Sequence, residues 1–160
     1  MPSTSSDPST PGHARIARLL KLRLADALGL KAAATQAHWA VRGPNFVALD
    51  GLFDQLQENL EVHAEELEVL ITAMGGRVAL RTGTAAKNRS LQPLAGKIST
   101  GHVQVAALAD RLAHFARMLR DTRSAATKLH DPGTALICTG MVRDADKYRN
   151  LLKAHLGTHH

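Results

Sequence analysis

The residues best suited to chemistry are seven carboxylates between positions 50 and 68, in a stretch that contains no lysine or arginine. Six of them follow one another at spacings of four and three, which places them in one line along an α-helix. A solvated face usually mixes charges, whereas this one repels itself along its length. The pattern is therefore more typical of a surface that faces cations, either metal ions or basic residues of another subunit, than of an acidic face in solvent. The six are Asp50, Asp54, Glu58, Glu61, Glu65 and Glu68.

Several histidines could add a nitrogen to such a site and shift its preference towards iron, manganese or zinc. His38 would be the nearest, although its position equally fits a histidine that interacts with a helix dipole. His63 falls in the hydrophobic pattern, which favours a core or interface histidine over a ligand. Asp110 and His114 are four residues apart and are expected to be an exposed pair. His155, with His159 and His160, is expected in a fraying tail that binds metal only weakly.

Apolar repeats at helical spacing predict four long helices, at about 13–41, 46–74, 99–129 and 132–156. The second repeat is the longest. Asn45 is expected to cap this helix after a break at Gly43-Pro44, and Gly75-Gly76 to end it. Asp131-Pro132 is the start signal of the last helix. The predicted core stripe of the second helix consists of Leu49, Phe53, Leu56, Leu60, His63, Leu67, Leu70 and Met74.

The joints between these helices predict the topology. The first two helices, and the last two, are joined by so few residues that they must be antiparallel neighbours. The stretch from Gly75 to Ile98 can cross the length of the bundle, so the second and third helices can run parallel. The chain is therefore predicted to be all-α, a ferritin-like four-helix bundle with one long crossover that has room for a short helix. Residues 1–12 are expected to be a disordered tail, 13–156 the domain and 157–160 a second tail.

Composition narrows the class of protein. The chain has 160 residues, a formal charge of +6 and a pI near 10.0, a balance that favours contact with nucleic acid or anionic surfaces. Its one cysteine, Cys138, excludes an internal disulfide framework and a CxxC zinc site. The absence of Glu-x-x-His excludes the di-iron site of a single bundle. With no apolar run of about 18 residues and no signal-peptide pattern, we expect a soluble protein of a reducing compartment.

The segment from His38 to Phe46, which reads HWAVRGPNF, resembles the Dps family, the ferritin-like proteins that protect DNA in starved bacteria. Asp54, the triplet Met74-Gly75-Gly76 and the run from Arg143 to Tyr148 extend the resemblance. The resemblance implies a hollow homododecamer that oxidises ferrous iron with peroxide or oxygen and stores the ferric product. It also implies non-specific DNA binding, a role in the stress response and a cytoplasmic, nucleoid-associated location.

In Dps proteins the ferroxidase site spans a twofold interface, and the resemblance carries over to this chain only in part. One subunit supplies two histidines and an aspartate. His38 matches the first histidine and Asp54 the aspartate, and Asp50 stands at the second histidine position. Trp39, directly after His38, is either an electron donor or, the preferred interpretation, a packing residue.

The neighbouring subunit supplies an aspartate and a glutamate in Dps proteins. Glu65 stands at the aspartate position and Val69, which cannot coordinate a metal, at the glutamate position. Glu68 is adjacent and could share that face. The resemblance therefore implies an oxygen-rich iron site with slower or altered oxidation, in which His38, Asp54 and Glu65 carry the catalysis. The implied metal ligands are His38, Asp50, Asp54, Glu65 and Glu68.

Two further departures concern iron entry and DNA. Dps proteins usually line a threefold pore with acids near the start of the last helix, where this chain has only Asp131. Residues 1–12 contain no basic residue, so DNA contact must use the outer surface, where Arg111, Arg117 and Arg120 could lie unless they are paired within the assembly.

The alternative function is a DNA-binding shell whose ferroxidase centre has degenerated at Asp50 and Val69. A helical adaptor unrelated to metal is a third, less favoured hypothesis.

Overall fold

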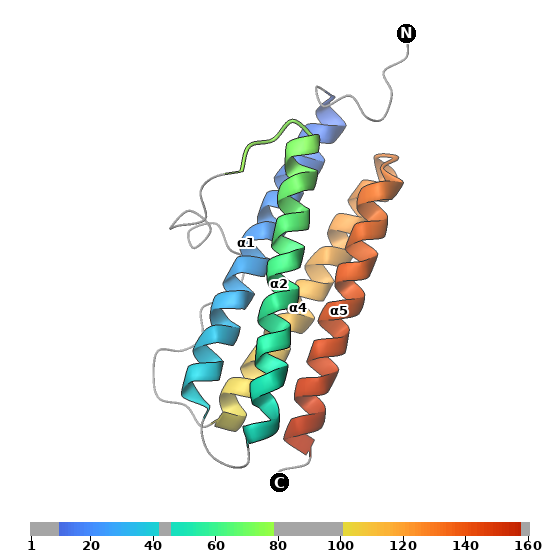
Figure 1. Cartoon of the computed structure of the whole chain (residues 1–160). Coiled ribbons are helices and arrows are strands. Elements are labelled where there is room, and N and C mark those ends of the chain that lie inside the picture. Colours follow the sequence, from blue (N-terminus) through green and yellow to red (C-terminus); the bar gives the residue numbers. More distant parts are fainter. Residues whose placement is uncertain (1–9, 42–45, 79–100, 158–160) are drawn as a thin grey trace.

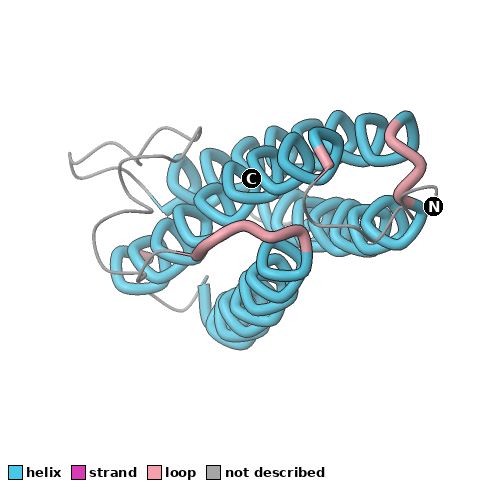
Figure 2. Tube along the Cα trace, turned by 90° about the horizontal axis from the view of Figure 1, so that it is seen from above, coloured by secondary structure: helices cyan, strands magenta, loops and turns pink. Residues whose placement is uncertain are grey.

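The structure is a computed structural model that describes residues 10–41, 46–78 and 101–157. Its four helices are α1 (Pro11–Ala40), α2 (Val47–Ala73), α4 (Gly101–Lys128) and α5 (Pro132–Gly157). Figure 2 shows helices and loops, and no strand, in this part of the chain. No described helix is long and apolar enough to cross a membrane.

The helices form a bundle in which α2 and α4 run in the same direction, while α1 and α5 run in the opposite one (Figure 1). Helix α1 packs on α2 and on α4, and α4 packs along α5, whereas α2 and α5 approach each other over fewer residues. This arrangement confirms the predicted all-α, ferritin-like bundle with a crossover between parallel helices. The crossover itself and any short helix in it, at 79–100, lie outside the described residues.

The core is aliphatic, as the low aromatic content predicts, and Phe53 and Phe115 are its largest buried side chains. The predicted stripe of α2 is buried as far as Leu67, but the next buried residue is Ile71, and Leu70 and Met74 are only half-buried. At about 100° per residue, Ile71 lies about 40° round the helix from Leu67, and Leu70 about 60°. Leu70 and Met74 still pack against the core, so the predicted stripe continues to its end, but its most buried line shifts to Ile71.

Helix α1 begins at Pro11, two residues before the predicted His13, so Pro11 and Gly12 are helical and do not belong to a tail. Thr10 caps the helix, because its Oγ1 accepts a hydrogen bond from the His13 backbone N–H at 3.1 Å. Proline at the first helical position costs no hydrogen bond, since that amide would have no partner within the helix. The cap and the proline together explain the earlier start.

Helix α2 begins at Val47, with Phe46 in the N-cap position and no side-chain cap, so the prediction of Asn45 as the cap was wrong. The predicted break at Gly43-Pro44 lies outside the described residues. The Phe46 ring instead packs on the start of α4. A Cβ at Gly101 would come within 2.6 Å of Phe46 Cζ, so a larger residue there would have to displace the ring.

The end of α2 confirms the predicted glycine signal. Gly75 adopts a φ of 82°, and its N–H donates to the Thr72 carbonyl at 3.0 Å. Gly76 N–H donates to the Ile71 carbonyl at 2.9 Å, which completes a Schellman motif. The positive φ favours glycine at position 75, and a Cβ on Gly76 would come within 2.8 Å of Ile71 Cγ2 and 3.1 Å of the Ile71 carbonyl oxygen.

Helix α4 ends in the same motif, with a histidine where α2 has glycine. His130 has a φ of 59°, and its N–H donates to the Thr127 carbonyl at 3.1 Å. Asp131 N–H donates to the Ala126 carbonyl at 2.9 Å, and its carboxylate then caps α5. It accepts hydrogen bonds from Thr134 N–H at 3.1 Å and from Thr134 Oγ1 at 2.6 Å, which confirms the predicted start signal.

A glycine at position 130 should stabilise the protein. The left-handed conformation costs a non-glycine residue roughly 1–2 kcal/mol, and the extra freedom of glycine in the unfolded chain offsets part of the gain. We expect His130→Gly to raise the free energy of unfolding by about 0.5–1 kcal/mol in urea denaturation followed by circular dichroism. Gly75→Ala is the matched control and should lower it. A lower stability of His130→Gly would contradict the strain argument.

A buried ion pair lies within α1, and its arginine also links α1 to α4. Arg23 Nε lies 3.0 Å from Asp26 Oδ2, and the two side chains are 5% and 0% exposed. Arg23 Nη1 donates to Thr122 Oγ1 at 3.2 Å and contacts the Met118 carbonyl at 3.4 Å. The sequence signal for this pair is weak: two charges three residues apart in a helix that is otherwise rich in leucine and alanine.

Cys138 is fully buried on α5. Burial raises the pKa of its thiol to about 11, against a partial lowering by Arg123 and Arg23. The thiolate is the reactive form, so we expect the folded protein to resist a thiol reagent at pH 8 and to react once denatured. Rapid labelling without denaturant would contradict the burial.

Candidate metal centre

Three of the predicted ligands meet where the last turn of α1 lies beside the first turns of α2. His38 Nε2 is 3.4 Å from Asp50 Oδ1, and His38 Nδ1 is 3.6 Å from Asp54 Oδ1. Asp50 and Asp54 are four residues apart, so both carboxylates project from one face of α2. The buried ring of Phe53 lies 5.4 Å from the imidazole, centroid to centroid, and holds it in place.

The chemistry of the imidazole limits what these groups can do together. A neutral imidazole has one N–H donor and one accepting nitrogen, so at most one of the His38 nitrogens can bind a cation. The other can donate to the remaining carboxylate, as in the carboxylate–histidine–metal arrangement of many metal sites. The Asp50 and Asp54 side chains are 66% and 67% exposed, and that of His38 is 29% exposed. A cation can therefore reach all three groups directly from solvent.

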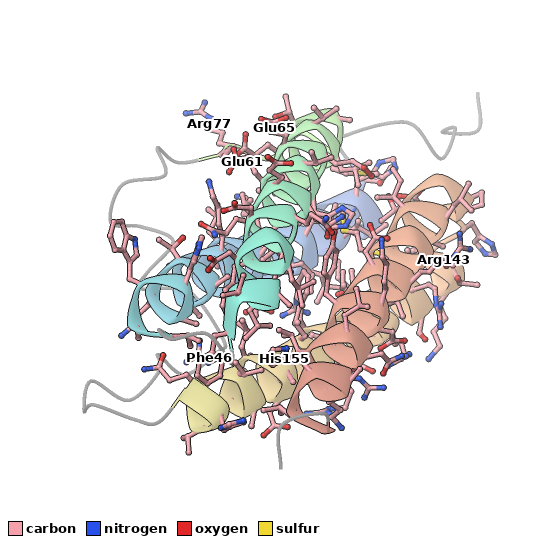
Figure 3. The ribbon with its side chains drawn as sticks, turned by 60° about the horizontal axis from the view of Figure 1, so that its bottom comes forward. Phe46, Glu61, Glu65, Arg77, Arg143 and His155 are labelled. Carbon is pink, nitrogen blue, oxygen red and sulfur yellow. The ribbon has the colours of Figure 1, made fainter. Side chains whose placement is uncertain are left out.

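Glu65 and Glu68 do not join this group within one subunit. Glu65 is eleven residues beyond Asp54, about 16 Å along the helix axis. Figure 3 shows Glu61 and Glu65 towards one end of α2, far from Phe46 at the other. Val69 is 69% exposed on the same half of the helix. Across the described ranges, no three His, Cys, Asp or Glu side chains are arranged to hold a metal ion.

The acidic stripe is not uniformly self-repelling. Lys31 Nζ on α1 lies 2.9 Å from Glu61 Oε2, and both side chains are partly exposed. This interhelical pair neutralises one of the six stripe carboxylates. The prediction that the stripe repels itself throughout was therefore wrong at Glu61, since sequence spacing within α2 carries no information on α1.

His63 is 8% exposed and belongs to the core, as predicted. Its Nε2 lies 2.9 Å from Asp144 Oδ2, which also accepts a hydrogen bond from Asn59 Nδ2 at 2.9 Å. The same Asp144 acts on Tyr148, one turn further along α5. The pKa of Tyr148 is raised, mainly because the side chain is buried and to a smaller extent because the charges of Asp144 and Glu58 are near. The sequence placed Asp144 only in the motif of the last helix and missed its role as the partner of His63.

Of the other histidines, His114 lies in α4 and His155 in α5. His114 is half-buried on α4 and makes no ion pair with exposed Asp110 within the described residues. His155 packs in α5 with its ring 5.9 Å from that of Phe46, so its placement in a fraying tail was wrong (Figure 3). His159 and His160 lie outside the described residues. Trp39 is 71% exposed, which contradicts a packing role in the core of its own subunit.

Comparison with known proteins decides the family. The model of the ferritin-like domain matches residues 17–159. The chain belongs to the ferritin-like family. The DNA protection during starvation protein of Agrobacterium fabrum is 28% identical over 153 residues, which cover 96% of this chain and 94% of that protein. The predicted membership of the Dps family is confirmed.

Solved Dps structures share the fold. Dps from Thermosynechococcus elongatus superposes with a TM-score of 0.86 at 22% identity, covering 94% of this chain and 95% of that one. The Dps protein of Vibrio cholerae O1, described as a member of a broad superfamily of ferritin-like diiron-carboxylate proteins, gives a TM-score of 0.82 at 21% identity. It covers 91% of each chain. The bundle described above is thus the fold of the Dps proteins.

Proposed function

We propose that this Dps-family protein is a subunit of a shell that oxidises ferrous iron with peroxide or oxygen and stores the ferric product, which protects DNA from oxidative damage. The observation that carries the proposal is the placement of His38 between the carboxylates of Asp50 and Asp54 on an accessible surface. One nitrogen and several carboxylate oxygens form a donor set suited to iron. The likeness to Dps proteins supports the choice of iron among the metals that such donors accept.

The site is completed by a second copy of the chain. An antiparallel pairing of two α2 helices about a twofold axis would bring Glu65 and Glu68 of each copy towards His38 of the other. Val62 and Val69 are 57% and 69% exposed on α2, which suits a contact between copies. The likeness to Dps proteins further supports a homododecamer. A stable species near 17 kDa in sedimentation would contradict the assembly.

In the proposed reaction, electrons pass from the ferrous iron, which is the substrate, to the oxidant. One peroxide accepts an electron from each of two ferrous ions and takes up two protons, which leaves two water molecules and two ferric ions. The carboxylates of Asp50, Asp54 and Glu65 stabilise the more highly charged ferric product. One ring nitrogen of His38 is the nitrogen ligand. The N–H of the other ring nitrogen donates a hydrogen bond to Asp50 or Asp54.

The test is addition of ferrous iron to the metal-free protein while ferric absorbance is followed, first with oxygen and then with peroxide. We expect oxidation well above the protein-free rate, saturating at a fixed iron count per site. A rate equal to that of buffer would contradict the ferroxidase proposal and favour the alternative below.

Restoring a carboxylate at position 69 should accelerate the oxidation. We expect Val69→Glu to raise the initial rate by roughly tenfold, because a missing ligand group typically costs at least that much in metal affinity or activity. Val103→Glu, which places a carboxylate at an exposed valine of α4, away from the proposed site, is the control and should leave the rate unchanged. An equal rate in Val69→Glu and the parent would indicate a centre already abandoned.

The alternative is a DNA-binding shell with a degenerate metal centre, favoured by Val69 at a ligand position and by the net charge of +6. Arg117 is exposed on α4, whereas Arg120 is paired with Asp146 at 2.8 Å and is less available. A cytoplasmic, nucleoid-associated location belongs to either function. In a gel-shift assay this protein should retain DNA of any sequence at low salt and release it as salt rises. Binding that is unaffected by salt would contradict a phosphate contact.

A further inference from the structure

A groove of about 680 Å³ lies between the end of α4 and the start of α5. The turn between these helices is at the opposite end of the bundle from the last turn of α1 (Figure 1). None of its lining residues is acidic. The Leu136 side chain forms part of its wall and is 73% exposed. The lining consists of one guanidinium, one imidazole, two hydroxyls and three apolar side chains: Arg123, Thr127, His130, Pro132, Ala135, Leu136 and Thr139.

The Arg123 guanidinium is the principal charge of the groove. Its one hydrogen bond within the described residues is long, from Nη1 to Thr139 Oγ1 at 3.4 Å. No carboxylate among these residues forms an ion pair with it. A guanidinium carries five N–H donors in a planar fork, which matches the oxygens of a phosphate group. Most of this fork is thus available to a ligand.

The other polar groups of the lining carry no negative charge. Asp131 is the closest carboxylate in sequence to the groove, and it is committed to the cap of α5 through two hydrogen bonds from Thr134. The hydroxyl hydrogens of Thr127 and Thr139 are donated to backbone carbonyls at 3.0 Å. The lining side chains therefore carry the positive charge of Arg123, while Asp131, beside the groove, keeps its negative charge and is held at the cap.

His130 adds a second donor to the same groove. Its φ of 59° places it in the turn between the two helices, and its ring is part of the lining. An imidazole donates a hydrogen bond in both its neutral and its protonated form, and the protonated form adds a positive charge. Arg123 and His130 thus offer donors from two elements to one anion.

We propose that this groove is an oxyanion site that binds a phosphate group, either inorganic phosphate or a phosphate of a DNA backbone. Arg123 binds the phosphate oxygens through its free N–H groups, and His130 donates a further hydrogen bond. The apolar wall of Pro132, Ala135 and Leu136 limits the water that competes for these donors.

The test is titration of the metal-free, full-length protein with inorganic phosphate, followed by ³¹P NMR and calorimetry at constant ionic strength set with chloride. We expect saturable binding that Arg123→Gln weakens by tenfold or more. Arg143→Gln, which removes an exposed arginine elsewhere on α5, is the matched control and should bind as the parent does (Figure 3). Absent saturation in the parent, or an equal loss in both variants, would overturn the proposal.

A second variant leaves Arg123 in place. Leu136→Glu puts a carboxylate at the exposed wall of the groove and should also abolish phosphate binding. The circular dichroism spectrum and the shell size are measured alongside, to separate this loss from a change in fold or assembly. Unchanged phosphate binding in Leu136→Glu would place the anion elsewhere and overturn the assignment. None of these measurements involves iron, so their outcome is independent of the ferroxidase proposal.

A short DNA duplex distinguishes the two sources of phosphate. If the duplex displaces inorganic phosphate from the parent, and Arg123→Gln weakens duplex binding more than Arg143→Gln does, the site binds the DNA backbone. If the duplex leaves bound phosphate in place, the site is specific for the free ion. Either result supports the oxyanion site.

Discussion

Alanine in place of His38 should lower the rate of ferrous iron oxidation by the metal-free protein by roughly 10–100-fold. His38 is the one nitrogen donor in the group, and each of its ring nitrogens lies within 3.6 Å of a carboxylate oxygen. Its loss leaves an oxygen-only site, which prefers hard cations and holds ferrous iron poorly. The same variant should bind fewer ferrous ions per subunit in anaerobic calorimetry.

The control for His38→Ala is His114→Ala, which removes a half-buried imidazole from α4, a helix that contributes nothing to the proposed site. We expect this control to oxidise iron at the rate of the parent. The shell size of both variants is checked by sedimentation, so that a change in assembly is separated from a change in chemistry. Equal activity in His38→Ala and the parent would remove His38 from the site.

Alanine in place of Asp26 should lower the free energy of unfolding by about 3–5 kcal/mol. The substitution leaves the charge of Arg23, itself 5% exposed, buried without its nearest carboxylate. The remaining contacts of Arg23, with Thr122 and the Met118 carbonyl, are uncharged and cannot neutralise the guanidinium. Urea denaturation followed by circular dichroism measures the loss.

The matched control for Asp26→Ala is Asp146→Ala, which breaks the ion pair with Arg120. The side chains of that pair are 43% and 32% exposed, so the loss should be about 1 kcal/mol or less. The double variant Arg23→Met, Asp26→Leu removes both charges and should recover most of the stability. A loss for Asp26→Ala no larger than that for Asp146→Ala would show that burial adds nothing to the pair.

The sequence by itself determined the helices, their directions in the bundle and half of the proposed metal site. His38, Asp50 and Asp54 lie within seventeen residues of one another, across a single joint between antiparallel helices. Helical periodicity places the two carboxylates on one face, and the short joint places His38 beside them. These are local constraints, which a sequence pattern can carry.

Tertiary structure alone decided the contacts between helices distant in sequence. Lys31 reaches Glu61, Asp144 reaches His63, and Arg23 reaches Thr122 across 30, 81 and 99 residues. Each contact depends on how far one helix slides and rotates against another, which the packing of both hydrophobic stripes determines together. The groove at Arg123 has the same origin, because its lining comes from two helices and the turn between them. Spacing along one helix defines a face, and only packing defines what that face meets.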